Sequence, residues 1–283
     1  MKQIGYYNGK LGPLEEMTIP MNDRASYFGD GVYEAVIVAD GVPFALEDHF
    51  DRFYDSLQFL EIPFTMSREE LEAELMKCVE ASEGDYVWLY WQCSRGTAPR
   101  THVYPANASP NLTIMVLPNV REDIDRKMKL TLVEDIRWDL CNVKTLNQIP
   151  SVLACETAKQ RGCDEAIFHR GEIVTECSHS NIFMLKDGVL RTHPANHHIL
   201  PGISRKHLIE MAPQQGIPVV EEAFTIAELM EADEIIVSSS GTFCASAVDV
   251  DGTPVGGKDP ERLQLLQRCC LERFSNYISS SSR

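Results

Sequence analysis

The spacing of hydrophobic residues changes many times along the chain, and each change marks the start of another predicted helix, strand or turn. In the first part, β-branched and aromatic residues form short runs between turn residues, which is typical of strands. Two other runs repeat their apolar residues every three or four positions, as amphipathic helices do. We therefore expect strands at residues 4–7, 14–19, 32–39, 42–45, 86–94 and 112–117, and helices at 46–60 and 67–82.

The second part of the chain combines hairpins with helices, and a polar stretch at residues 119–125 reads as a linker before it. Glycine accepts positive φ, so the turns ending in Gly171, Gly188 and Gly252 predict hairpins. We expect the fold class α+β, with a small N-terminal α+β domain (1–118) and a larger, β-rich cofactor-binding domain (126–283). The further strands predicted for this domain are 128–135, 218–222 and 234–239. Its predicted helices are 150–161, 203–215, a short one that starts at residue 225, and 259–277, and we expect a frayed tail at 279–283.

Composition and charge exclude several classes of function. The chain of 283 residues has 42 acidic and 26 basic residues, a formal charge of −16. Binding to nucleic acid or to an anionic membrane requires clustered Lys and Arg, so neither partner is expected. No run of 18 apolar residues predicts a membrane-spanning helix. The nine cysteines include no C-x-x-C pair, so we expect a reduced, cytoplasmic protein.

Lys144 is the first candidate for chemistry, because it lies among mostly uncharged neighbours in the strand-like segment 133–147. A lysine in a partly apolar pocket loses solvation of its ammonium group, which lowers its pKa. A neutral amine can then attack a carbonyl carbon and form a Schiff base. Taken alone, however, Lys144 is better explained as a half-buried lysine whose charged end reaches the surface.

The segment Thr175–Asn181 favours the interpretation of Lys144 as the Schiff-base lysine. A lysine followed by Thr-Glu-x-Ser-x-Ser-Asn and an apolar strand resembles the fold-type IV pyridoxal-phosphate aminotransferases. That family includes D-amino-acid and branched-chain aminotransferases and aminodeoxychorismate lyase, and the resemblance covers nearly the whole chain. It implies the cofactor pyridoxal 5'-phosphate in a cleft between the two domains, with Lys144 carrying it and Glu176 facing its ring nitrogen. A charge-assisted bond there would keep the ring protonated.

Two small, hydroxyl-rich segments match the family's two phosphate-binding turns in order and spacing. Leu200–Arg205 runs into a predicted helix, and a glycine before a helix N-terminus frees backbone N–H groups for an anion. An ordinary helix cap would explain this segment equally well. Ser238–Thr242 is a second candidate anion-binding turn at a strand end. The cofactor-binding residues that the resemblance carries over here are Arg52, Ile203, Ser204, Ser240 and Gly241.

The loop Ser94–His102 distinguishes between branches of the family. Arg100 and His102 alternate, so their side chains can point the same way if the loop is extended, although an ordinary surface loop is the alternative. The resemblance to D-amino-acid aminotransferases implies that both reach the neighbouring subunit's site and bind the substrate α-carboxylate together with Tyr33. We therefore expect a homodimer that exchanges the amino group of a D-amino acid, of the D-alanine or D-glutamate type, with a 2-oxo acid.

Three positions depart from the family pattern. His179 stands where relatives have a small hydroxyl residue, Gly241 replaces a threonine, and Ala35 stands where a valine is common. L-branched-chain aminotransferase and aminodeoxychorismate lyase activity remain alternatives, as does non-catalytic binding of phosphorylated metabolites. The pair Asn147-Gln148 differs from the Asn-Tyr pair of branched-chain enzymes. His197-His198 show no metal-ligand spacing, so no metal is expected.

Overall fold

The structure, a computed structural model, describes residues 2–107 and 109–281. They form two compact units, and Lys144 belongs to the first of them. The first unit comprises the chain up to Arg121, the segment Val143–Asn147 and the chain after Ser275, and the second comprises Glu122–Asn142 and Gln148–Ser275.

Within its described residues, the first unit is built on a six-stranded antiparallel sheet in the order β2-β1-β6-β5-β3-β4. Two of its central strands, Tyr86–Ser94 and Asn111–Pro118, alternate buried with partly buried side chains, because one face packs on the core. The elements are β1 (Ile4–Tyr7), β2 (Lys10–Pro13), a 3-10 turn (Leu14–Glu16), α1 (Arg24–Phe28), β3 (Gly31–Ala39), β4 (Val42–Pro43), α2 (Leu46–Phe59), α3 (Arg68–Ser82), β5 (Tyr86–Ser94) and β6 (Asn111–Pro118).

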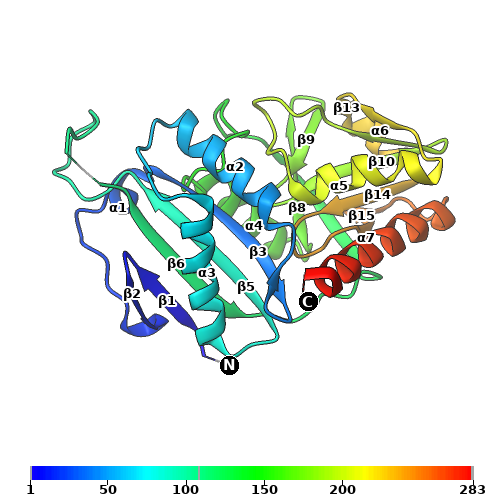
Figure 1. Cartoon of the computed structure of the whole chain (residues 1–283). Helices are drawn as coiled ribbons and strands as arrows, with labels where there is room; N and C mark the ends of the chain where they lie inside the picture. The colour runs from blue at the N-terminus through cyan, green and yellow to red at the C-terminus, as the bar shows by residue number, and fades with distance from the viewer. Residues whose placement is uncertain (1, 108, 282–283) are drawn as a thin grey trace. The chain divides into compact units, whose positions relative to one another are not determined.

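Helices α2 and α3 cover one face of this sheet (Figure 1). The aromatic side chains of Phe50 and Phe53 on α2 pack edge-on against Trp91 of β5, and all three are fully buried. A capping box begins α3: the Ser67 hydroxyl accepts from the Glu70 backbone N–H, and the Glu70 carboxylate accepts from the Ser67 backbone N–H. The first unit therefore has a continuous core beneath its two helices.

The second unit contains, among its described residues, a ten-stranded mixed sheet in the order β12-β11-β10-β14-β15-β7-β8-β9-β13, with β16 beside β15. Strand β7 pairs in parallel with both β8 and β15, which joins the hairpins into one sheet. Together with the first unit, this arrangement confirms the α+β class. The elements are β7 (Lys127–Glu134), α4 (Ile149–Gln160), β8 (Glu165–Arg170), β9 (Ile173–Cys177), β10 (Asn181–Lys186), β11 (Val189–Thr192), α5 (Ile203–Met211), a 3-10 turn (Pro213–Gln215), β12 (Val219–Glu221), β13 (Phe224–Thr225), α6 (Ile226–Met230), β14 (Glu234–Ser238), β15 (Ala245–Val250), β16 (Thr253–Pro254) and α7 (Pro260–Ser281).

The strand predicted at residues 14–19 is wrong. Asn8 and Gly9 both have positive φ, 46° and 92°, and form a two-residue turn that pairs Tyr7 directly with Lys10. The partner strand β2 therefore covers Lys10–Pro13, and the following residues turn away from the sheet. The pattern also missed the short helix α1, whose N-cap Asp23 accepts a hydrogen bond from a backbone N–H.

The segment that carries Lys144 is not a strand. Residues 135–148, all of them described, form an irregular connection from β7 to α4 with one isolated bridge, between Thr145 and Val32. This bridge lies in the first unit and brings the segment beside β3. The lysine is therefore placed by a long-range contact, which the local hydrophobic pattern does not encode.

Several element ends differ from their predicted positions. Strand β4 stops at Pro43, because Ala45 adopts a left-handed conformation (φ 55°) as the N-cap of α2. Helix α5 stops at Met211, and Pro213 begins a separate 3-10 turn. The predicted fraying of the C-terminal tail is wrong for residues 279–281, which continue α7, whereas residues 282–283 lie outside the described chain. Among the described helices, none is both long and apolar enough to traverse a bilayer.

Candidate active site

Lys144 lies against an aromatic face in the first unit. Its Nζ is 4.2 Å from the centroid of the Tyr33 ring, and its backbone carbonyl accepts a 3.0 Å hydrogen bond from the Tyr33 N–H. Tyr33 in turn stacks on Tyr90, with 5.5 Å between the ring centroids. An ammonium over a tyrosine face is stabilised by the ring quadrupole. These two contacts hold both the backbone and the amine of Lys144 against Tyr33. The sequence analysis assigned the two residues to the same site.

A buried ion-pair cluster lies in the same unit. Glu34 of β3 accepts from Arg52 Nε and Nη2, at 2.7 and 2.8 Å, and from His49 at 2.7 Å. Burial raises the pKa of Glu34, but the Arg52 and His49 contacts outweigh it and hold that pKa well below its usual range. Burial lowers the pKa of His49, and the charge of Lys144 lowers it further. The charge of Lys144 therefore acts on His49 in this cluster. The predicted contact of Arg52 with a phosphate stays a prediction.

Arg100 and His102 lie on the same aromatic ring. The Arg100 guanidinium carbon is 5.0 Å from the centroid of the Phe28 ring, and the His102 ring centroid is also 5.0 Å from it. Both side chains are exposed. The alternation in sequence therefore does place the two on one side of their loop, although the loop is irregular and not extended.

Two buried arginines fix the base of that loop. Asp30 accepts from Arg24 Nε at 2.7 Å and from Arg95 Nε at 2.9 Å. Arg24 also donates to the backbone carbonyl of Thr101 at 2.8 Å, between the two predicted substrate-binding residues. Because Arg24 and Arg95 are buried, breaking this cluster would leave unpaired charges. The loop is therefore held in one conformation at its centre.

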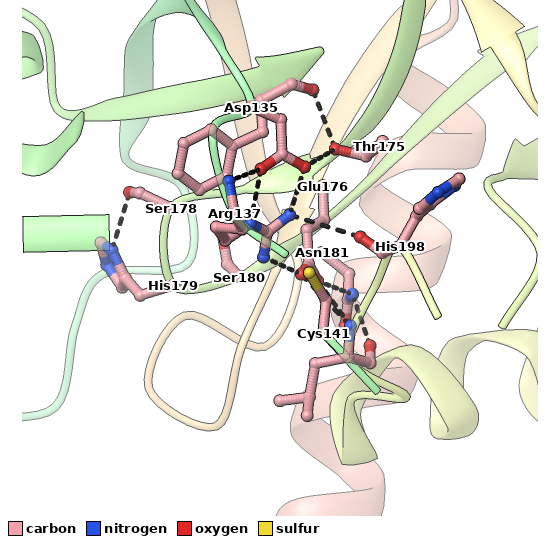
Figure 2. A network of polar contacts seen from close by, with 12 residues as sticks. Asp135, Arg137, Cys141, Thr175, Glu176, Ser178, His179, Ser180, Asn181 and His198 are labelled. Carbon is pink, nitrogen blue, oxygen red and sulfur yellow. Dashed lines mark hydrogen bonds and ion pairs between the residues drawn. The ribbon is translucent and has the colours of Figure 1, made fainter. Parts of the chain in front are cut away.

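Glu176 is the centre of the polar network in the second unit, and Figure 2 shows it from close by. Its Oε1 accepts from Arg137 Nη1 at 2.6 Å, and its Oε2 accepts from Asn181 Nδ2 at 2.9 Å. The Leu200 backbone N–H, about equally far from both oxygens, donates at 3.2 and 3.1 Å. Arg137 is itself bound by both oxygens of Asp135. These contacts fix the Glu176 carboxylate in one orientation.

Burial raises the pKa of Glu176 to about 7, and Arg137 only partly opposes that shift. The ionised form of a buried carboxylate whose pKa is raised is strongly stabilised by a cationic partner. The protonated nitrogen of a pyridine ring is such a partner, so the environment of Glu176 fits the ring nitrogen that the sequence assigned to it.

The raised pKa predicts how stability depends on pH. In protein freed of small molecules, Glu176 holds its proton up to about pH 7 when folded but only to about 4.5, its ordinary pKa, when unfolded. Unfolding then releases a proton between these values, so rising pH lowers the free energy of unfolding, by roughly 3 kcal/mol. The Glu176→Gln variant should lack this decrease. Urea unfolding of both proteins across this pH range tests it, and parallel pH profiles would contradict the assignment.

The two predicted phosphate turns lie together in the second unit. Ser204 Oγ, in the first turn of α5, donates to the Ser239 carbonyl at 2.8 Å. Ser239 Oγ accepts from the backbone N–H groups of Gly241 and Thr242, which makes a tight turn that includes Ser240. The N-cap of α5, Gly202, provides no side-chain cap. The structure therefore brings Ile203, Ser204, Ser240 and Gly241 to one place, at a helix N-terminus suited to an anion.

The phosphate turns and Glu176 share one segment of chain. Asn181 donates both to Glu176 and to the Leu200 carbonyl, each at 2.9 Å. A Cβ atom added at Gly202 would collide with the Asn181 side-chain oxygen. Glycine is required at this position because the amide that supports Glu176 packs directly on the backbone leading into α5.

The sequence analysis missed Arg137, Asp135 and Asn181 as supports of Glu176. One signal was available: Asp135 and Arg137 are oppositely charged residues two positions apart. In the structure, burial raises the pKa of Asp135, but bonds from Arg137 and Arg170 outweigh it and lower that pKa. Which carboxylate Arg137 would also reach depends on the parallel pairing of β7 with β8, and no local pattern specifies that pairing.

The sequence analysis considered His197-His198 as metal ligands but not Asp139, which lies beside them in the structure. Asp139, His197 and His198 place ligand atoms within 4.8 Å of one another. Arg170 is ion-paired with Asp139, and partial burial together with the Arg170 charge lowers the pKa of His198, so a cation is already close to this group. The expectation of no metal stays a prediction.

The comparisons with known proteins agree with this arrangement. The family described as "Amino-transferase class IV" matches residues 31–249. A D-alanine aminotransferase of Staphylococcus haemolyticus is 37% identical over 287 residues, covering 98% of each chain. A D-alanine aminotransferase of Listeria monocytogenes is 39% identical over 268 residues, covering 92% of each chain.

Solved structures show the same fold. A branched-chain amino acid aminotransferase from Escherichia coli has a TM-score of 0.87 at 23% identity, covering 97% of this chain and 95% of that chain. A branched-chain aminotransferase from Thermoproteus uzoniensis has a TM-score of 0.86 at 23% identity, covering 99% and 98%. The fold is that of the fold-type IV aminotransferases, and the protein is an enzyme, a transaminase. The chain belongs to the amino-transferase class IV family, whose members depend on pyridoxal phosphate.

Proposed function

We propose that this enzyme is a D-amino-acid aminotransferase that exchanges the amino group of D-alanine or D-glutamate with a 2-oxo acid. The observation that carries the proposal is the match over nearly the full chain to proteins named D-alanine aminotransferase. The branched-chain enzymes among the solved structures are 24% identical or less, so they support the fold and not that substrate. L-branched-chain aminotransferase and aminodeoxychorismate lyase activity remain the competing functions.

The proposed cofactor is pyridoxal 5'-phosphate, and two features of the structure support it. Glu176 is a buried carboxylate whose raised pKa favours a cationic partner such as a ring N–H. The uncapped start of α5 and the adjoining Ser239 turn offer backbone N–H groups to a phosphate. In this proposal Lys144 forms the covalent link to the cofactor, Arg52, Ile203, Ser204, Ser240 and Gly241 hold its phosphate, and Glu176 holds its ring nitrogen.

The residues divide the chemistry among them. When bound, the cofactor supplies an electron sink for the pair of electrons left at the substrate Cα. The amine of Lys144, once displaced by the substrate amino group, removes the Cα proton as a general base and returns a proton as a general acid. Glu176 keeps a proton on the ring nitrogen, and Arg137 and Asn181 keep Glu176 oriented. Tyr33 positions the amine beneath its ring.

We further propose that the working unit is a cytoplasmic homodimer, in which Arg100 and His102 reach the substrate site of the neighbouring subunit. Their exposure on one side of a fixed loop supports this role. Val103 and Tyr104, which follow directly, are also exposed, and apolar side chains of that size favour burial in an interface. All nine cysteines are unpaired, as in a reducing compartment.

Substrate specificity is tested by a panel of D- and L-amino acids with pyruvate and 2-oxoglutarate as acceptors. We expect D-alanine or D-glutamate to give the highest kcat/KM. A preference for L-valine or L-leucine would exclude the proposed function in favour of branched-chain activity. Release of pyruvate from aminodeoxychorismate, without an added 2-oxo acid, would indicate the lyase instead.

The proposed role of Arg100 predicts a loss confined to substrate binding. A charge-assisted hydrogen bond contributes about 1.5–3 kcal/mol, so Arg100→Ala should lower kcat/KM for D-alanine by about one to two powers of ten. The visible absorption of the bound cofactor should not change, because Arg100 does not hold the cofactor in this proposal. Arg268→Ala, which removes an exposed arginine of α7, is the matched control. Equal kcat/KM in both variants would exclude Arg100 from the substrate site.

A further inference from the structure

A thiol, an imidazole and a carboxylate meet in the second unit, outside every residue assigned above to cofactor or substrate. Cys155 of α4 has its Sγ 3.6 Å from His179 Nδ1 and 3.3 Å from Ser178 Oγ. His179 lies in the turn that joins β9 to β10, and its Nδ1 is 3.1 Å from the same Ser178 hydroxyl, a contact drawn in Figure 2. The three side chains therefore form a compact triangle across two elements.

Glu165 supports this triangle from the buried side. Its Oε1 is 3.2 Å from His179 Nδ1 and accepts from the His179 backbone N–H at 3.0 Å. The hydroxyls of Ser178 and Ser180 also donate to the Glu165 carboxylate, which is only 1% exposed. Glu165 thus approaches the same Nδ1 atom that faces the thiol. Its negative charge favours the imidazolium form of His179, and an imidazolium beside a thiol favours the thiolate.

The charges follow this geometry. The bond with His179 lowers the pKa of Cys155, although partial burial and the negative charge of Glu165 oppose it. Partial burial would lower the pKa of His179, but the Cys155 bond and the negative charges of Glu165 and Glu122 raise it to about 9. The pKa of the Cys155 thiol is thus lowered and the pKa of the His179 imidazole is raised. These are the directions expected when the proton passes from sulfur to nitrogen.

The chain carries its own comparison thiols. Cys141, Cys163 and Cys269 are, like Cys155, neither fully buried nor fully exposed. Burial raises the pKa of each of them, that of Cys141 to about 11. Their thiols stay protonated near neutral pH, so they react slowly with disulfides. Cys155 differs from them in having an imidazole and a carboxylate beside it, and not in its accessibility.

We propose that Cys155 is a site of reversible covalent modification, at which His179, kept positively charged by Glu165, holds the sulfur as a thiolate ready to exchange with a small disulfide. The Cys155 sulfur attacks one sulfur of the disulfide, a new S–S bond forms, and the original S–S bond breaks. The second half leaves as a thiolate with the electron pair and takes a proton from solvent. The Cys155 sulfur is oxidised, the leaving sulfur is reduced, and no further oxidant is consumed.

The proposal explains why a bulky histidine stands in this turn, where the family pattern has a small hydroxyl residue. Ser178 and Ser180 already satisfy Glu165 through their hydroxyls. The His179 side chain is 60% exposed, so it is not needed to fill the core. Its polar contacts are with Cys155, Ser178 and Glu165, and the first of these has no function in the transamination proposed above.

The test uses the full-length enzyme with its cofactor and glutathione disulfide as the probe near pH 7. Peptide mapping by mass spectrometry over time gives the rate at each cysteine. We expect Cys155 to be modified first, at least about ten times faster than Cys163. The His179→Ser variant should lower the rate at Cys155 about tenfold and leave the rate at Cys163 unchanged. His197→Ser, which removes an exposed histidine of another loop, should change neither rate.

Two results would overturn the proposal. One is a rate at Cys155 no higher than at Cys163, and the other is a rate at Cys155 that survives His179→Ser. The unchanged rate at Cys163 serves as the check that the variant is folded. In the wild-type enzyme the rate at Cys155 should also fall less steeply with decreasing pH than the rate at Cys163, because less of its thiolate is lost.

Discussion

Replacing Lys144 with alanine should reduce transamination by about 10⁴-fold or more and abolish the visible absorption of covalently bound cofactor. The variant loses both the attachment point and the group that moves the Cα proton. Its fold should persist, because the lysine is only partly buried and its contact with the Tyr33 ring contributes about 0.5–1 kcal/mol. Absorption spectra, steady-state rates and thermal unfolding of the same samples measure the three effects.

Lys159→Ala is the matched control for this experiment. Lys159 is exposed in the last turn of α4, so its removal should leave rate and absorption unchanged. An added small primary amine should partly restore proton transfer in the Lys144 variant but not its covalent absorption. If the Lys144 variant turned over normally without added amine, another group would be the base, and the central assignment would be wrong.

Local patterns in the sequence predicted most of the elements but not every connection. The heptad-like spacing of α2, the capping box of α3 and the glycine turns of the hairpins act through neighbouring residues, so they can be read directly. The position of residues 143–147 depends instead on the bridge between Thr145 and Val32, more than 100 positions apart. A contact of this kind does not affect the local spacing of hydrophobic residues, so the segment was wrongly predicted to be strand-like.

The residues of the candidate site were likewise only partly predictable from the sequence. Lys144 and Glu176 were found because the order of residue types around them is specific to a chemistry. Arg137 was missed because its role arises only when the connection after β7 lies beside β9, and Asn181 because its role arises only when the segment ending at Leu200 lies beside it. Tertiary contacts of this kind orient the reactive carboxylate, whereas the sequence motif specifies only that a carboxylate is present.

Glu176→Gln should lower kcat by about a hundredfold while the cofactor remains bound. The carboxylate now accepts from Arg137, Asn181 and the Leu200 N–H, and all three are donors. An amide turns its own N–H₂ toward one side of this ring of donors, and it carries no charge to keep a proton on the cofactor nitrogen. Losing one charge-assisted bond at about 1.5–3 kcal/mol corresponds to a loss of roughly one to two powers of ten.

The cofactor's phosphate contacts at Ser204 and the Ser239–Thr242 turn should be unaffected, since they use backbone N–H groups and hydroxyls away from the Glu176 carboxylate. Titration of the cofactor-free variant with pyridoxal 5'-phosphate should therefore give a dissociation constant within about tenfold of the wild-type value. Glu172→Gln, at an exposed position between β8 and β9, controls for the loss of one charge. An unchanged kcat in the Glu176 variant would show that another carboxylate serves the ring nitrogen. A loss of cofactor binding with no separate effect on kcat would show that Glu176 acts in binding alone.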